Sequence, residues 1–166
     1  MTSPWDVVEK LHEDHDISRL VCGLPSVDEW LQNQARTSAR HVATHVCVNG
    51  TGSVVGFFAL KTVIVTTAGL SSRIRNGSQD GQSVGILLCQ MGLDKPLQGN
   101  GNGKLLLRRA LEEAVTAHES SPVQLFVVDA ANEDLIRFYQ FPGMQLVPNT
   151  TRLMAPMGSI VKAVRP

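Results

Sequence analysis

The spacing of apolar residues predicts a helix early in the chain. In the segment SVDEWLQNQA the apolar positions recur at near-helical intervals: Val27, Trp30, Leu31 and Ala35. Ser26 and Glu29 have the spacing of a capping box at the start of this segment. Because residues three and four positions apart share one helix face, the pattern predicts an amphipathic helix.

Strand-like segments follow this helix. HVATHVCVNG and TGSVVGFFALKTVIVT are rich in β-branched and aromatic residues, and the turn signal Asn49-Gly50 separates them, so they predict an antiparallel hairpin. Residues 67–85 are polar and glycine-rich, which predicts a mobile surface loop. The nearly continuous apolar run of residues 86–93 predicts a strand that is buried on both faces.

A helix and a further strand come next. Apolar residues at positions i, i+3, i+4, i+7 and i+8 from Leu107 predict a helix that follows a glycine-rich stretch. Residues 123–128 are again apolar and predict a buried strand. The order strand, helix, strand implies a right-handed unit with two parallel strands.

The C-terminal part of the chain predicts one more helix and the closing strands. Asn132 is expected to cap this helix, and Pro142 and Gly143 are expected to end it. Short apolar runs from residue 144 onward predict one or two closing strands.

Composition narrows the class of protein. A chain of 166 residues is most simply one domain, residues 1–166. The 15 basic and 15 acidic residues cancel, so the net charge does not indicate a nucleic acid or a membrane as partner. The three cysteines favour a reduced, cytoplasmic protein over a disulfide framework or a metal site. No export signal or membrane-spanning run is expected from the N-terminus or from the apolar segments.

The stretch LQGNGNGKLLL contains the main chemical signal. Gly99, Gly101 and Gly103 alternate with asparagine between a predicted strand and a predicted helix. Glycine leaves the main chain reachable, and a helix N-terminus presents free N–H groups to an anion. The stretch therefore predicts a phosphate-binding loop, whereas its alternative interpretation is a plain glycine-rich turn.

Two common nucleotide motifs do not match this stretch. A P-loop needs a hydroxyl after its lysine, but Leu105 follows Lys104, and the alternating glycines do not form GxGxxG. The pattern QxxGxG is met by Gln98, Gly101 and Gly103. This resembles the acetyl-coenzyme-A motif of the GNAT N-acetyltransferases, in which the loop holds the pyrophosphate of the coenzyme.

The resemblance extends over most of the chain. DAANEDLIRFYQFPGM resembles the GNAT segment that carries an asparagine loop and a Phe-Tyr pair, and HDISRLVCGLPSVDEWLQNQA resembles the N-terminal signature of the GNAT toxins of toxin-antitoxin systems. The chain departs from the toxin pattern at four positions: Gln90, Asn102, Pro142 and Met144. The loss of an arginine at Gln90 weakens any nucleic-acid contact expected there.

The resemblance implies a fold, a cosubstrate and a site. The fold is the α/β GNAT fold, a single mixed and largely antiparallel sheet with a splayed parallel strand pair, flanked by helices. The cosubstrate is acetyl-CoA. The residues expected to bind it are Met91, Gly92 and Leu93 in the buried strand, Gln98, Gly99, Asn100, Gly101, Asn102, Gly103 and Lys104 in the loop, and Asn132 and Phe138 beyond the next strand.

Tyr139 is the candidate catalytic acid. In GNAT enzymes the acceptor amine attacks the thioester directly, and the departing thiolate needs a proton. A phenol with a pKa of about 10 is neutral at pH 7 and can stabilise and protonate a sulfur whose thiol has a pKa of about 8.5. The alternative is that Tyr139 only packs beside Leu135.

A general base is not evident in the sequence, which favours an α-amine as acceptor. An α-amine has a pKa of about 7.7–8.0 and is partly neutral at pH 7, whereas a lysine amine near 10.4 is almost wholly charged. Asp129 or a bound water is the alternative base. The toxin resemblance implies aminoacyl-tRNA as acceptor, a ribbon-helix-helix antitoxin as partner and a homodimer. The alternatives are transfer to a small amine or a protein N-terminus, and a non-catalytic coenzyme-A-binding module.

Basic residues and histidines are weaker signals. Side chains that could hold RNA phosphates beside a cleft are Arg36, Arg40, His41, Lys61, Arg73 and Arg75, although scattered surface charge is the alternative. His12 and His15 lie one residue short of HExxH spacing, so we expect solvated surface there and no metal site.

Overall fold

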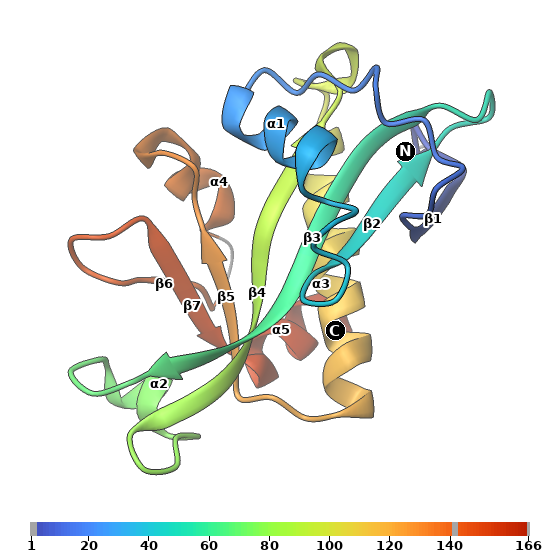
Figure 1. Cartoon of the computed structure of the whole chain (residues 1–166). Helices are drawn as coiled ribbons and strands as arrows, with labels where there is room; N and C mark the ends of the chain where they lie inside the picture. The colour runs from blue at the N-terminus through green and yellow to red at the C-terminus, as the bar shows by residue number, and fades with distance from the viewer. Residues whose placement is uncertain (1–2, 141–142, 166) are drawn as a thin grey trace. The chain divides into compact units, whose positions relative to one another are not determined.

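The computed structural model describes residues 3–140 and 143–165. In chain order its elements are β1 (Val7–Lys10), α1 (Pro25–Asn33), β2 (Ala43–Val48), β3 (Val54–Thr66), α2 (Ser72–Arg75), β4 (Gln82–Leu93), the 3₁₀ turn η1 (Lys95–Leu97), α3 (Asn102–Ser120), β5 (Leu125–Asp129), the 3₁₀ turn η2 (Glu133–Leu135), α4 (Ile136–Tyr139), β6 (Gln145–Leu146), β7 (Arg152–Pro156) and α5 (Met157–Val164) (Figure 1). None of the helices in this described part is long and apolar enough to cross a membrane.

The strands form a mixed sheet with the order β1-β2-β3-β4-β5-β7-β6. β4 and β5 are parallel, whereas the pairs β1–β2, β2–β3, β5–β7 and β6–β7 are antiparallel. The predicted mixed, largely antiparallel sheet with one parallel pair and flanking helices is confirmed.

The chain divides into two compact units. The first comprises Met1–Lys61 and Cys89–Ala110, and the second comprises Thr62–Leu88 and Leu111–Pro166. The division runs through β3, β4 and α3, so each of these elements contributes residues to both units. A single domain over residues 1–166 stays a prediction.

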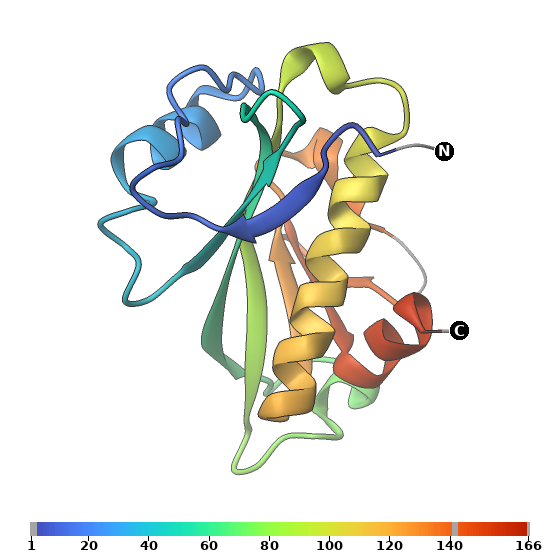
Figure 2. The same cartoon turned by 90° about the vertical axis from the view of Figure 1, so that its right-hand side faces the viewer.

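The first unit is built on the predicted hairpin. β2 and β3 pair antiparallel, and the Asn49 carboxamide oxygen accepts the N–H groups of Thr51 and Ser53 in the connection. β1, which the sequence patterns did not predict, pairs with β2 (Figure 2). α1 buries Val27 and Leu31 in the core of this unit, where their packing partners include strand residues: Val46, Val54 and Phe57.

The predicted capping box of α1 is wrong. The N-cap is Leu24, it makes no side-chain capping hydrogen bond, and Pro25 stands at the start of the helix. Ser26 and Glu29 therefore lie inside the helix. Proline at the first helical position supplies a suitable φ angle and lacks the N–H that a cap would satisfy, so the helix starts without the box.

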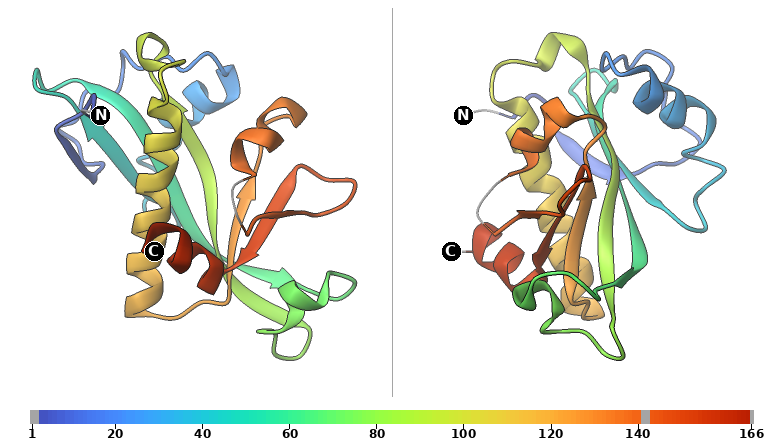
Figure 3. Two further views of the ribbon diagram at one scale, coloured as in Figure 1. Left: turned by 180° about the vertical axis from the view of Figure 1, so that it is seen from behind. Right: turned by 90° about the vertical axis from the view of Figure 1, so that its left-hand side faces the viewer.

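The second unit carries the parallel ladder and the C-terminal elements. β4 pairs with β5 from Gly85↔Leu125 to Leu88↔Val128, which confirms the predicted parallel unit. β6 and β7 are the predicted closing strands, while α5 was not predicted and packs against β5 and β7 (Figure 3). The stretch 67–85, predicted as a loop, contains α2 and the start of β4.

Candidate functional site

The glycine stretch forms an open turn between η1 and α3 in the first unit. Gly99 and Gly101 have φ angles of +88° and +83°, a region that strains any residue with a Cβ atom. An added Cβ on Gly99 would find no atom within 4 Å, so the space beside the main chain is open. The two glycines thus allow this turn and leave its main chain reachable.

The start of α3 supplies hydrogen-bond donors. The N–H of Leu105 donates to the carbonyl of Gly101 at 3.2 Å, which closes the first turn. The N–H groups of Asn102, Gly103 and Lys104 precede this bond and have no carbonyl within the helix to accept them. Together with the helix dipole and the exposed Lys104 ammonium, these N–H groups are able to hold an anion such as a phosphate.

Two polar side chains of the motif hold the loop itself. The carboxamide nitrogen of Gln98 donates to the carbonyls of Cys22 and Leu93, each at 2.7 Å. That of Asn102, a residue only 8% exposed, donates to the carbonyl of Leu97 at 2.9 Å. Through these bonds the two side chains position the turn, and the main chain of residues 98–104 is left to meet a ligand.

The end of β4 leads into this turn without a β5 partner. The β4–β5 ladder ends at Leu88↔Val128, whereas β4 continues to Leu93. Gly92 is buried here, and an added Cβ would stand 2.8 Å from Cε1 of Phe57, so no larger residue fits without a shift. Gly92 therefore offers main chain alone at this point, and the main chain of residues 91–93 has no partner in β5.

The second unit carries the other predicted site residues. Asn132 caps η2 as predicted, because its carboxamide oxygen accepts the N–H of Leu135 at 3.1 Å. Tyr139 ends α4 and is only 7% exposed, and its ring meets Phe138 edge to face with centroids 5.1 Å apart. The predicted helix end at Pro142 lies outside the described residues, and α4 stops at Tyr139.

Burial sets the acidity of Tyr139. Desolvation raises the pKa of its phenol to about 12, because the charged phenolate would lose its hydration. The hydroxyl has no hydrogen-bond partner among residues 3–140 and 143–165. Tyr139 is thus neutral at any physiological pH and can act as a hydrogen-bond donor.

Arg152 was missed by the sequence patterns. It lies opposite Asp129 in the β5–β7 register, and its Nε and Nη2 donate to the two carboxylate oxygens of Asp129 at 2.7 and 2.8 Å. This bidentate bond raises the pKa of the Arg152 guanidinium. Asp129, the alternative base, therefore has both oxygens engaged. No spacing rule could have paired these residues, because only the strand register brings them together.

The four predicted RNA-binding arginines are exposed, two in each unit. In the first unit, Arg36 donates to the carbonyls of His12 and His15, while Arg40 extends from the segment after α1. In the second unit, Arg73 donates to the Ser159 hydroxyl, and Arg75 donates to the carbonyl of Leu70. Three of the four thus have local partners that occupy part of their donor capacity.

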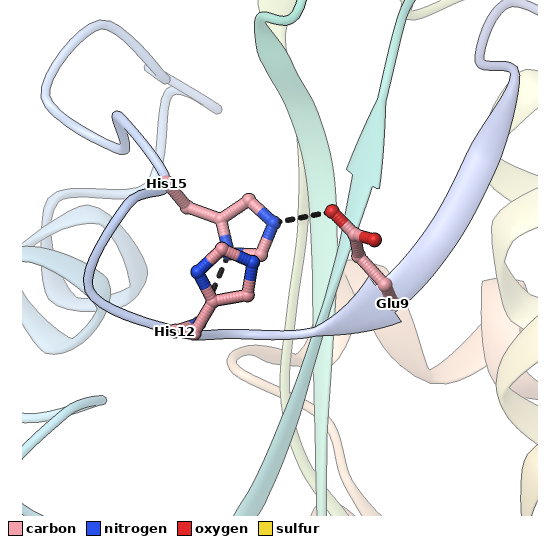
Figure 4. Close-up of side chains that lie close together, drawn as sticks. All are labelled: Glu9, His12 and His15. Atoms are coloured by element: carbon pink, nitrogen blue, oxygen red, sulfur yellow. Dashed lines mark hydrogen bonds and ion pairs between the residues drawn. The ribbon is translucent and has the colours of Figure 1, made fainter.

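Glu9, His12 and His15 lie close enough together to be considered as metal ligands (Figure 4). The His12 N–H donates to Nδ1 of His15 at 3.0 Å, so the neutral His15 ring carries its proton on Nε2 and donates it to Glu9 at 2.6 Å. A metal ion on Nε2 would require a proton on Nδ1, facing the His12 N–H. The hydrogen-bond polarity therefore opposes a metal site. The expected solvated surface is wrong for His15, which is 9% exposed.

Comparison with known protein families identifies the chain. The model described as "Acetyltransferase (GNAT) family" matches residues 5–143. The chain belongs to the GNAT acetyltransferase family. Among curated GNAT relatives, a tRNA-acetylating toxin of Mycobacterium tuberculosis (strain ATCC 25618 / H37Rv) is 29% identical over 147 residues, which cover 88% of this chain and 88% of the toxin.

Solved structures of other proteins share this GNAT fold. A tyrosine-to-phenylalanine mutant of KacT matches with a TM-score of 0.85 and 20% identity, over 95% of this chain and 98% of that one. AtaT complexed with acetyl-methionyl-tRNAfMet matches with a TM-score of 0.82 and 22% identity over the same shares. AtaTR bound with acetyl-CoA matches with a TM-score of 0.79 and 23% identity, over 95% of this chain and 96% of that one.

Acetyl-CoA is the cosubstrate of the family, and the residues of this chain fit it. The open turn at Gly99 and Gly101 and the free N–H groups at the start of α3 suit a pyrophosphate. The unpaired end of β4 offers main-chain groups to an amide-containing chain such as pantetheine.

Proposed function

We propose that this chain is a toxin that acetylates the α-amine of aminoacyl-tRNA and thereby blocks translation. The observation that carries the proposal is the likeness to a tRNA-acetylating toxin over 88% of both chains. The fold shared with AtaT and KacT, whose solved structures include a tRNA complex and an antitoxin–DNA complex, is consistent with it.

The cosubstrate supplies a thioester whose carbonyl carbon is attacked and whose thiolate leaves. In the proposed role, the N–H groups at the start of α3 hold its phosphates, and the end of β4 binds its amide groups. The Tyr139 hydroxyl donates a hydrogen bond to the sulfur as negative charge develops on it.

The proton balance favours an α-amine acceptor. The attacking nitrogen loses one proton, and the sulfur gains one. Both carboxylate oxygens of Asp129 already accept hydrogen bonds from Arg152, so this carboxylate is held by its neighbour and is not the base of the proposal. An acceptor that is already partly neutral at pH 7 needs no strong base before it attacks, and an α-amine meets that condition.

The partners and the place of action follow from the same proposal. In this proposal the chain acts in the cytoplasm, forms a homodimer and is inhibited by a ribbon-helix-helix antitoxin. Arg36, Arg40, Arg73 and Arg75 contribute positive charge to RNA phosphates through the donors that their local partners leave open. His41 and Lys61 add to this charge.

The experiment is acetylation of total aminoacyl-tRNA by the purified protein with labelled acetyl-CoA, with methionine methyl ester as a small-amine comparison. We expect labelled acetyl-aminoacyl-tRNA, and a rate that falls steeply as salt rises from about 50 to 200 mM, while the ester reaction changes little. Acetylation of the ester but of no tRNA would refute the toxin function and favour the small-amine alternative. Binding of acetyl-CoA without any transfer would favour the non-catalytic module.

A further inference from the structure

The peptide between Asp129 and Ala130 lies where the parallel ladder ends. β5 still pairs with β7 at Asp129↔Arg152, but its pairing with β4 stops at Leu88↔Val128. In open parallel sheets, ligands bind beyond the carboxyl ends of the strands. Asp129 is the last residue of β5 and therefore stands at such a position.

The orientation of this peptide follows from one hydrogen bond. The Ala130 N–H donates to the Thr151 carbonyl, on the β7 side, at 3.0 Å. The N–H and C=O of a trans peptide point in opposite directions, and the described chain has no cis peptide. The carbonyl of Asp129 belongs to the same peptide as the Ala130 N–H. It therefore points to the β4 side of β5, past the last paired residues.

The side chains of Asp129 and Arg152 hold this peptide in place. Both carboxylate oxygens of Asp129 accept hydrogen bonds from Arg152 on the neighbouring strand. A bidentate pair fixes the distance and the angle between the two strands, which a single surface contact does not. The Asp129 side chain is 41% exposed and the Arg152 side chain 36%, so the ion pair contributes little to the stability of the fold. Its main effect is to fix the geometry of the two strands.

We propose that the carbonyl of Asp129 binds the acceptor amine, and that the Arg152–Asp129 ion pair positions this carbonyl. The inference rests on the proposed transfer to a primary amine and deepens it by naming the group that receives the amine. The carbonyl accepts one N–H of the neutral amine, while the nitrogen lone pair remains free to attack.

This contact strengthens during the reaction. As the nitrogen forms its bond to the acetyl carbon, it becomes positively charged, and its N–H becomes a stronger donor to the Asp129 carbonyl. The C–S bond breaks with its electron pair on sulfur, the nitrogen releases one proton and the sulfur takes one up. Arg152 and the Asp129 carboxylate touch neither atom, so they are positioning residues.

Kinetics of Arg152→Gln test the positioning pair. Acetylation of methionyl-tRNA and of methionine methyl ester is measured for the wild type, Arg152→Gln and Arg152→Lys, with Arg165→Gln as matched control because Arg165 pairs with Glu119 elsewhere in the second unit. We expect kcat to fall about 10- to 100-fold in Arg152→Gln. The affinity for acetyl-CoA should stay unchanged, kcat should partly recover in Arg152→Lys, and Arg165→Gln should equal the wild type.

A labelled carbonyl tests the contact directly. Asp129-Ala130 is the only Asp-Ala pair in the sequence, so carbonyl-¹³C aspartate combined with ¹⁵N alanine gives one coupled NMR signal, from this peptide. With coenzyme A bound, methionine methyl ester should shift that carbonyl signal in the wild type and shift it much less in Arg152→Gln. A role limited to holding the fold would produce no amine-dependent shift.

The outcomes separate this inference from the proposed function. No shift at saturating ester, a kcat in Arg152→Gln within twofold of the wild type, or an equal loss in Arg165→Gln would overturn the inference. If the ester is acetylated and tRNA is not, the toxin function fails while the carbonyl site can still be confirmed on the ester. If neither amine is acetylated, both fail.

Discussion

Replacement of Tyr139 by phenylalanine tests the central catalytic prediction. The phenol, with a pKa of about 12, is a much weaker acid than a thiol near 8.5. Complete transfer of its proton to the departing thiolate would therefore be uphill by about 3.5 pKa units, or roughly 5 kcal/mol. The phenol is expected to donate a hydrogen bond to the developing thiolate instead, and the proton that reaches the sulfur has to come ultimately from the attacking amine.

The strength of the hydrogen bond from Tyr139 to the sulfur sets the expected loss of kcat. A hydrogen bond to a charged group contributes about 1.5–3 kcal/mol, so Tyr139→Phe should lower kcat by about 10- to 150-fold. The hydroxyl has no hydrogen-bond partner in the described part of the chain, so its removal should not lower the thermal midpoint. Acetyl-CoA affinity, measured by calorimetry, should be unchanged. A kcat within twofold of the wild type would remove Tyr139 from the chemistry, and a loss of cosubstrate affinity would assign it to binding instead.

Three further predictions follow from the backbone and from burial. Alanine at φ +83° costs about 1–2 kcal/mol, so Gly101→Ala should shift the turn to another conformation that binding must reverse, and acetyl-CoA affinity in calorimetry should fall about 5- to 30-fold. Gly52→Ala, with the same φ angle in the hairpin, should destabilise the fold but leave the affinity unchanged. Gly92→Ala should cost about 1–3 kcal/mol through its contact with Phe57 and lower the thermal midpoint by about 2–12 °C in calorimetric scans, and an unchanged midpoint would contradict this packing argument. Tyr139 is the only tyrosine, so phenolate absorbance should appear near pH 12 in the native protein and near pH 10 in denaturant. Since the folded pKa is the higher one, burial of Tyr139 should favour the fold below about pH 10, and this contribution should be lost as pH rises toward 12; titration near pH 10 in the native state would contradict the burial.

The sequence predicted the elements whose signals are local. Asn132 caps its turn as expected, because an N-cap depends on one side chain and the N–H groups just after it. The hairpin around Asn49 and the long helix after the glycines are confirmed for the same reason. Local signals also misled, since Ser26 and Glu29 have capping-box spacing but Pro25 already starts the helix.

Elements that depend on distant partners could not be predicted in this way. β1 is four residues long and exposes Val7, so it carries little apolar periodicity of its own and exists because it pairs with β2. Arg36 has the charge expected of an RNA contact, yet its guanidinium is bound to carbonyls 21 and 24 residues away. Strand pairing and side-chain contacts between distant residues cannot be recognised from the spacing of residues along the chain.

By itself the sequence determined an accessible main chain and free N–H groups at the start of α3, because alternating glycines stand before an amphipathic helix. Phosphate binding by these groups stays a prediction. Only the tertiary structure decided the orientation of Asp129 and Arg152 and the burial of Tyr139. The register of β7 against β5 places Arg152 beside Asp129, where the two side chains form an ion pair. The same register directs the Asp129 carbonyl to the β4 side of β5, and burial keeps Tyr139 neutral. Hydrogen-bond direction and desolvation depend on neighbours in space, which no pattern along the chain contains.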